Sequence, residues 1–177
     1  MRPDPYWLSP KRHLQRLRPD EAVMYFSPVA LQQTAQRFLD GFPGLVTYAV
    51  KANPCEAVLV NLVAAGVTGF DVASPAEMAA VRAVCPEAVL HYNNPVRSRD
   101  EIAAAARAGI ASASIDCPVE LDKLAPLGTD MEISVRLALP VRGAAYDFGA
   151  KFGVGPDRAA ELLRKVAERG YRPALTF

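Results

Sequence analysis

The sequence lacks the long apolar runs and the cysteine patterns that mark several classes of protein. Its purely apolar stretches, such as Leu62–Gly66 and Ile102–Ala106, are far shorter than the roughly 20 residues that a helix needs to cross a bilayer. The three cysteines are an odd number and include no CxxC pair, so we expect free thiols rather than a disulfide framework or a metal site. No GxGxxG fingerprint follows an apolar run, which weakens a dinucleotide-binding interpretation.

An excess of charge of one sign is also missing, because 20 basic and 19 acidic residues give a formal net charge of +1. Nucleic-acid binding requires a basic surface, so this balance gives no electrostatic reason to expect a nucleic-acid partner. The hydrophobic fraction of 51% excludes a disordered chain. The N-terminus carries no secretory signal, and together with the expected free thiols this indicates a cytoplasmic protein.

Residues 1–22 differ in composition from the rest of the chain, since they are basic and rich in proline. We expect an extension that wraps on the surface or is partly disordered. A transit peptide is disfavoured, because the prolines and acidic residues interrupt a basic amphipathic helix. Residues 23–177 would form the folded domain.

From residue 23 onward, short apolar and β-branched runs alternate with runs rich in alanine and leucine. The first kind predicts strands and the second predicts helices. The predicted strands are Val23–Phe26, Leu45–Val50, Gly69–Val72, Val89–Tyr92, Ala113–Asp116, Ile133–Leu137 and Ala174–Phe177. The predicted helices are Val29–Leu39, Glu56–Ala65, Ala76–Val84, Arg99–Arg107, Val119–Leu124 and Asp157–Arg169.

Three junctions before predicted helices share the pattern cap–Pro–x–Glu, namely Asn53–Glu56, Ser74–Glu77 and Cys117–Glu120. Proline suits the first helical position, and a glutamate at the third can accept a hydrogen bond from the N–H of the cap residue. Ser98–Glu101 is the same capping box without the proline. The repeated strand–helix unit requires parallel strands, because each helix carries the chain back to the starting edge of the sheet.

Repeated units of this kind form either an open doubly wound sheet or a closed (βα)8 barrel. A complete barrel needs about 250 residues, and at most six units fit in this chain. The expected fold class is therefore α/β, an incomplete (βα)8 TIM-type barrel with about six βα units and parallel strands. Since such a piece leaves two unpaired sheet edges, we expect it to be the N-terminal part of a longer protein.

Polar residues follow the predicted strands at their C-terminal ends, where parallel βα folds bind ligands. Lys51 is the most informative of them, because the chain has only five lysines against fifteen arginines and this one directly follows an apolar strand. A lysine that ends a buried strand loses hydration, which favours the neutral amine needed for Schiff-base chemistry. Alternatively, its ammonium group pairs with a carboxylate such as that of Asp71. The full set is Lys51, Asp71, Asn93, Asn94, Asp116 and Arg136.

Six segments carry a family resemblance: Tyr48–Asn53, Phe70–Glu77, Tyr92–Ser98, Ile115–Lys123, Val135–Leu137 and Lys151–Val154. In this order and spacing they resemble the motifs of the pyridoxal-phosphate-dependent ornithine/diaminopimelate decarboxylase family, whose barrel is of the alanine-racemase type (fold type III). The forms of the second, third and sixth segments are most similar to ornithine decarboxylases.

The resemblance implies roles for five residues. Lys51 would form the Schiff base with pyridoxal 5′-phosphate (PLP), and Asp71 and Arg136 would lie beside this cofactor. Glu77 would support the pocket, although its place in the capping pattern favours a purely structural role. Lys151 would lie near the partner subunit of a head-to-tail homodimer, or would be a solvated loop lysine.

The activity that the resemblance implies is PLP-dependent decarboxylation of a small basic L-amino acid, chiefly L-ornithine to putrescine in polyamine biosynthesis. The alternatives are a diaminopimelate decarboxylase, a racemase and a non-catalytic PLP-binding homologue. In this family a histidine that stacks on the cofactor, a glycine-rich phosphate loop and a C-terminal β domain follow the segments found here. We therefore expect residues 1–177 alone to be inactive.

Overall fold

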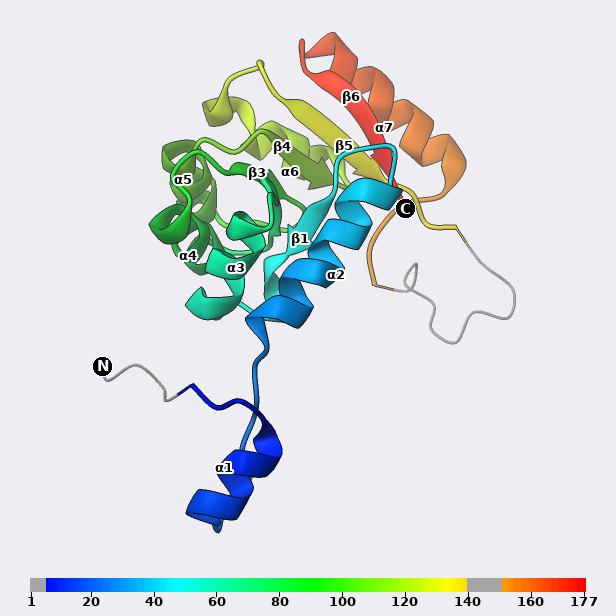
Figure 1. Cartoon of the computed structure of the whole chain (residues 1–177). Helices are drawn as coiled ribbons and strands as arrows, with labels where there is room; N and C mark the ends of the chain where they lie inside the picture. Colours follow the sequence, from blue (N-terminus) through cyan, green and yellow to red (C-terminus); the bar gives the residue numbers. More distant parts are fainter. Residues whose placement is uncertain (1–5, 140–150) are drawn as a thin grey trace.

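Six parallel strands form one sheet in which every strand lies beside its neighbours in sequence, in the order β1-β2-β3-β4-β5-β6 (Figure 1). The computed structural model describes residues 6–139 and 151–177. The strands are β1 (Thr47–Ala49), β2 (Gly69–Val72), β3 (Val89–Tyr92), β4 (Ser112–Ile115), β5 (Glu132–Arg136) and β6 (Arg172–Thr176). The expected α/β class, with parallel strands consistent with a partial TIM-type barrel, is confirmed.

Helices alternate with the strands, as the composition of the runs predicts. All six expected helices are present, and an additional one precedes them. They are α1 (Pro10–Leu17), α2 (Pro28–Gly41), α3 (Glu56–Ala64), α4 (Pro75–Val84), α5 (Arg99–Ala108), α6 (Pro118–Lys123) and α7 (Pro156–Glu168), with short 3-10 helices η1 (Val50–Ala52) and η2 (Ala125–Leu127). No described helix is long and apolar enough to traverse a bilayer.

The predicted capping patterns account for some helix starts and not for others. The complete capping box is at α5, where the Ser98 hydroxyl accepts from the Glu101 N–H at 3.2 Å and the Glu101 carboxylate accepts from the Ser98 N–H at 2.6 Å. At α3 the prediction is wrong by two residues: the cap is Cys55, and the Asn53 side chain instead accepts from the Cys55 N–H at 3.0 Å.

The two faces of the sheet differ in chemistry because side chains alternate along each strand. One face carries large apolar side chains that are buried against the helices, and Phe70, Leu90 and Ile133 among them are fully buried. The opposite face carries small or polar residues at aligned positions. The register pairs Ala49 with Asp71, Asp71 with His91, His91 with Ser112, and Ser114 with Ser134.

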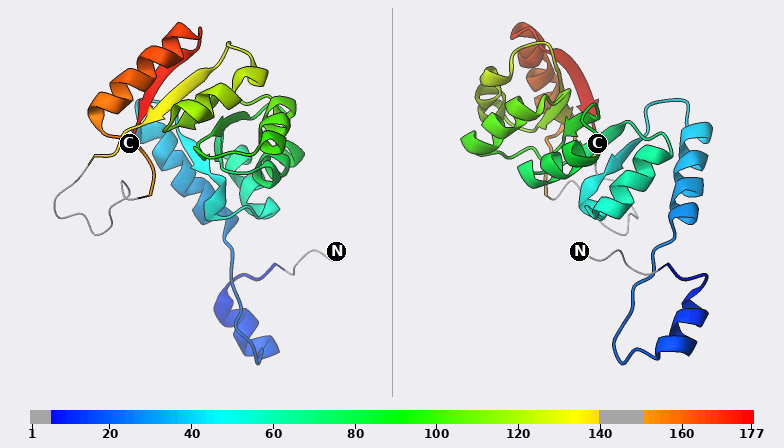
Figure 2. Two further views of the ribbon diagram at one scale, coloured as in Figure 1. Left: turned by 180° about the vertical axis from the view of Figure 1, so that it is seen from behind. Right: turned by 60° about the vertical axis from the view of Figure 1, so that its left-hand side comes forward.

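The N-terminal segment differs from expectation in two ways. Residues 10–17 form helix α1, which lies apart from the sheet and the other helices in every view (Figures 1 and 2). The Ser9 side chain caps this helix, and Pro10 occupies a first-turn position that needs no N–H, so this proline starts the helix rather than interrupting it.

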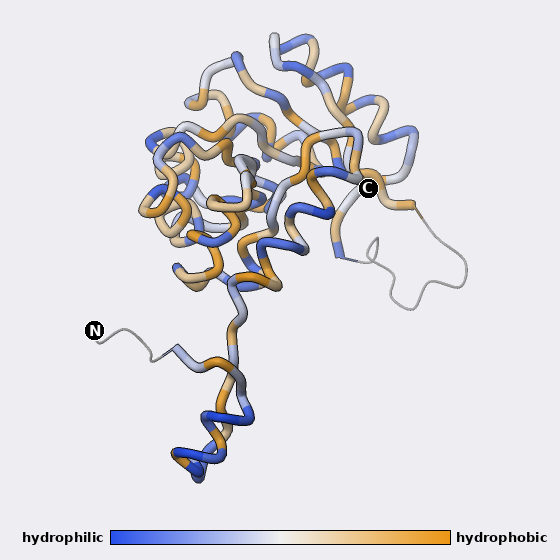
Figure 3. Tube along the Cα trace, viewed as in Figure 1, coloured by the Kyte–Doolittle hydropathy of each residue, from blue (hydrophilic) through white to orange (hydrophobic). Residues whose placement is uncertain are grey.

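The strand expected at Val23–Phe26 is absent, and these residues form an extended connection between α1 and α2. Its apolar side chains are exposed, with Met24 at 94%, and none of the strands in the described residues pairs with it. In Figure 3, α1 and this connection mix hydrophilic and hydrophobic positions outside the main body of the chain. Hydropathy alone could not distinguish this segment from a paired strand.

Candidate functional site

Four of the polar residues expected at strand ends lie at one edge of the sheet. Lys51 is in η1 directly after β1, Asp71 is in β2, Asn93 directly follows β3 and Arg136 ends β5. Parallel strands place their C-terminal ends at the same edge, which is why residues separated by 85 positions in sequence share one site.

Lys51 is exposed, and no ion pair joins it to Asp71 in the described part of the chain. The expected loss of hydration at this lysine is therefore wrong for these 177 residues. The reason is that η1 turns the chain at the end of β1, and β1 is an edge strand with only β2 beside it. Lys51 still contributes a positive potential at Asp71.

Asp71 is partly buried on the polar face of the sheet, and its carboxylate accepts a hydrogen bond from the Asn93 side-chain amide at 2.9 Å. Burial raises the pKa of Asp71 above its usual value, because removal from water disfavours the charged form. The hydrogen bond from Asn93 and the positive potentials of Lys51, His91 and Arg136 act in the opposite direction.

Arg136 donates from Nη1 to the backbone carbonyl of Asn93 at 3.0 Å. Its guanidinium also lies over the ring of Phe152, 5.6 Å from the ring centroid. Asn93 also contacts Asp71, so it links Arg136 to Asp71 indirectly. Asn93 was only one member of the polar set at the sequence level, and its bridging position follows from the strand register.

Two further residues with expected roles lie around this group. The Glu77 carboxylate accepts from the Ala73 N–H at 2.7 Å, so it is engaged at the start of α4, one residue before the cap at Ser74. Lys151 is exposed, with its ammonium 5.3 Å from the centroid of the Phe152 ring. The Asp116 carboxylate, also in the predicted set, accepts from the Gly153 N–H at 3.2 Å and fixes the segment that carries Phe152.

His91 lies on the same polar face, between Asp71 and Ser112 in the register. One ring nitrogen, Nδ1, is 2.8 Å from the Ser112 hydroxyl. Burial lowers the pKa of His91, with the acidic residues Glu132 and Asp71 opposing the shift. The folded chain therefore holds the His91 proton less tightly than the unfolded chain does.

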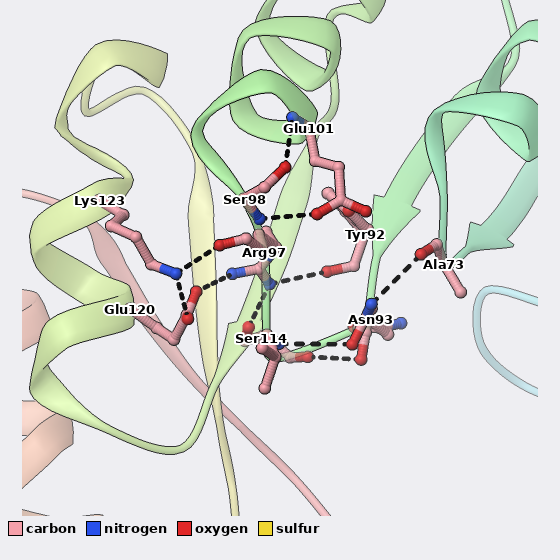
Figure 4. Close-up of polar contacts among 11 residues, drawn as sticks. Ala73, Tyr92, Asn93, Arg97, Ser98, Glu101, Ser114, Glu120 and Lys123 are labelled. Atoms are coloured by element: carbon pink, nitrogen blue, oxygen red, sulfur yellow. Dashed lines mark hydrogen bonds and ion pairs between the residues drawn. The ribbon is translucent and has the colours of Figure 1, made fainter.

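A buried ionic cluster lies beside strands β3 and β4 (Figure 4). Arg97 has a fully buried side chain, donates to the carbonyl oxygens of Tyr92 and Ser114, and lies 3.6 Å from the Glu120 carboxylate. Lys123 pairs with the same carboxylate and donates to the Arg97 carbonyl. Sequence reasoning missed this cluster, because Glu120 fits a capping pattern and the segment that contains Arg97 gives no sign that its side chain is buried.

The family model described as "Pyridoxal-dependent decarboxylase, pyridoxal binding domain" matches residues 29–170. The chain belongs to this pyridoxal-dependent decarboxylase family. The expected family and its cofactor, PLP, are thereby confirmed.

Two relatives of this decarboxylase domain are named for basic amino acids. The lysine/ornithine decarboxylase of Selenomonas ruminantium is 33% identical over 126 residues, which cover 71% of this chain and 32% of that protein. The ornithine decarboxylase of Panagrellus redivivus is 36% identical over 124 residues, which cover 70% and 28%. The chain thus spans about a third of the length of these curated relatives.

Solved structures agree with the fold. The lysine decarboxylase from Selenomonas ruminantium aligns with a TM-score of 0.79 and 26% identity over 97% of this chain and 46% of that chain. An arginine decarboxylase from Paramecium bursaria Chlorella virus aligns with a TM-score of 0.81 at 23% identity, over 93% and 46%. The latter likeness supports the fold of the decarboxylase domain alone.

The residues at the strand ends fit a pyridoxal cofactor in their chemistry. The exposed amine of Lys51 is open to an aldehyde, and the arginine and aspartate side chains offer charges of both signs. The polar face of the sheet beneath them carries short side chains, namely Ala49, Ser112, Ser114 and Ser134.

Proposed function

We propose that the protein decarboxylates a basic L-amino acid with PLP as its cofactor, and that L-ornithine, converted to putrescine, is the principal substrate. The proposal rests on the position of Lys51. Its exposed amine comes directly after β1 in the chain and lies at the same edge of the sheet as Asp71 and Arg136. Several relatives, including that of Panagrellus redivivus, are named ornithine decarboxylases, which supports this substrate.

PLP, when bound, supplies the electron sink that loss of CO2 from an amino acid requires. The residues of this chain would attach and hold it. Lys51 would bind the cofactor covalently and return a proton to the product. The carboxylate of Asp71 would hold a cationic group, such as a protonated lysine, near the cofactor. The guanidinium of Arg136 would attract an anionic group of the cofactor or the substrate.

We further propose that residues 23–177 are the N-terminal part of the PLP-binding barrel, and that residues 1–22 are an extension to it. The unpaired edges of β1 and β6 support this division, since a closed barrel would pair them. The complete protein would be a cytoplasmic homodimer with Lys151 at the subunit interface. The exposure of Lys151 leaves its ammonium accessible to a partner.

The direct test is CO2 release by the complete protein that contains these residues. With PLP present, it should release CO2 from L-ornithine faster than from L-lysine, L-arginine or meso-diaminopimelate. Lys51→Ala should abolish the release while leaving the far-UV circular dichroism unchanged. Substrate-dependent release that survives in Lys51→Ala would refute the proposed role of this lysine.

L-Lysine is the second candidate substrate, because the relative from Selenomonas ruminantium is named a lysine/ornithine decarboxylase. A ratio of kcat/KM near one for the two amino acids would favour dual specificity. Preference for meso-diaminopimelate would point to a diaminopimelate decarboxylase. Attachment of PLP at Lys51 without CO2 release from any of these substrates would instead identify a non-catalytic PLP-binding protein.

A further inference from the structure

Asn93 occupies a central place at the sheet edge that carries the proposed site. Its side-chain amide donates to Asp71 Oδ1 at 2.9 Å, and its backbone N–H donates to the Val72 carbonyl at 3.2 Å. Both contacts reach across to β2. The Asn93 residue therefore fixes the end of β3 against the strand that carries Asp71.

The backbone carbonyl of Asn93 accepts hydrogen bonds from β4 and β5. It accepts from Arg136 Nη1 at 3.0 Å and from the Ser114 hydroxyl at 2.9 Å (Figure 4 shows the Ser114 contact). One residue thus joins β2, β4 and β5 through groups that are independent of each other. The amide is a side-chain group that substitution removes, whereas the carbonyl belongs to the backbone and stays.

We propose that Asn93 is a positioning residue of the cofactor site, holding Asp71 through its amide and Arg136 through its carbonyl. This inference rests on the proposed function, in which those two side chains face PLP. A hydrogen bond from a neutral amide to a carboxylate fixes the orientation of the carboxylate and stabilises its charged form.

The charge on Asp71 depends on this contact because burial works against ionisation. The amide of Asn93 favours the carboxylate, as do the positive potentials of Lys51 on η1, His91 on β3 and Arg136 on β5. Without the amide, one of the contacts that oppose the rise in the Asp71 pKa caused by burial is lost. Asp71 would then take up a proton at a higher pH than in the wild type.

The experiment compares PLP binding by the wild type, Asn93→Ala and Asn61→Ala in the complete protein, measured by absorbance titration with PLP between pH 5 and pH 9. Asn61 is a matched control, because it is also half-buried and its side-chain oxygen accepts from the Gln32 side-chain amide at 2.7 Å between α2 and α3, away from the sheet edge. We expect Asn93→Ala to weaken PLP binding about tenfold, the loss of one hydrogen bond to a charged group.

We also expect the acid limb of the PLP-binding profile to move to higher pH in Asn93→Ala and to remain in place in Asn61→Ala. If Asn93→Ala fails to fold, Asn93→Ser carries the test with the same expectations, since its hydroxyl is too short to reach Asp71. A PLP affinity and pH profile equal to those of the wild type would overturn the role of Asn93.

The proposed function has a separate readout in the same samples. Borohydride reduction of the wild type with PLP should attach the pyridoxyl group to Lys51, as peptide mapping can show. Failure of that labelling would refute the proposed function itself. Normal labelling with an unaltered Asn93→Ala profile would refute only the inference about Asn93.

Discussion

Substitution of Arg97 by methionine tests whether burial gives the ionic cluster beside β3 and β4 its strength. The Arg97 side chain is fully buried and lies 3.6 Å from the Glu120 carboxylate, whose side chain is 6% exposed. The ring of Tyr92 lies under the guanidinium at 4.8 Å from its centroid. Methionine would keep much of the packing volume while removing the charge and the donors to two strand carbonyls.

Breaking a buried ion pair by removing one partner costs about 3 to 5 kcal/mol, because the remaining charge stays buried. Lys123 continues to pair with Glu120 after the substitution, so the lower end of this range applies. With an m-value of about 2 kcal/mol/M in urea, a loss of about 3 kcal/mol lowers the unfolding midpoint by about 1.5 M.

The matched control is Arg158→Met, which removes a pair of nearly the same length. Arg158 lies 3.5 Å from Glu161, but both side chains are well exposed, at 56% and 38%. We expect the urea midpoint of this variant, followed by far-UV circular dichroism, to stay close to that of the wild type. Equal midpoint shifts for the two variants would refute the reasoning, because distance and not burial would then set the strength of the pair.

Two further predictions concern stability. Burial lowers the pKa of His91, so as the pH falls the unfolded chain binds a proton at this residue before the folded chain does. The contribution of the neutral His91 side chain to stability is therefore complete above about pH 6.5 and is lost as the pH falls through the pKa of the folded chain. The loss of unfolding free energy between pH 7.5 and pH 5.5 should therefore be smaller in His91→Gln than in the wild type, and an equal loss would contradict this. Ser98→Ala, which removes the side-chain cap of α5, should cost about 1 kcal/mol in urea unfolding, whereas an unchanged midpoint would show that the capping box is not stabilising.

The order of strands and helices could be read from the sequence because hydrophobic patterning and capping chemistry act locally. Strands β2 and β3 were predicted residue for residue, since each is a short segment in which apolar residues alternate with Asp71 or His91. The segment Val23–Phe26 has the same local pattern and still forms no strand. Strand formation needs a pairing partner, and a local pattern contains no information about one.

The sequence predicts that these polar residues lie together at the C-terminal ends of the strands, but it does not predict their contacts. The rule that ligands bind at the C-terminal ends of parallel strands brought Lys51, Asp71 and Arg136 together before any coordinates. The bridging contacts of Asn93 depend on register across three strands, which one sequence does not specify. The turn at η1, which leaves Lys51 exposed, likewise follows from its position beside an edge strand.

Covalent mapping tests directly whether Lys51 is the residue that binds the cofactor. The complete protein is incubated with PLP, reduced with borohydride, digested and examined by mass spectrometry, with Lys51→Arg in parallel. The account predicts a pyridoxyl group on Lys51 and no specific label in the variant. A label on another lysine, or equal labelling of Lys51→Arg, would contradict it.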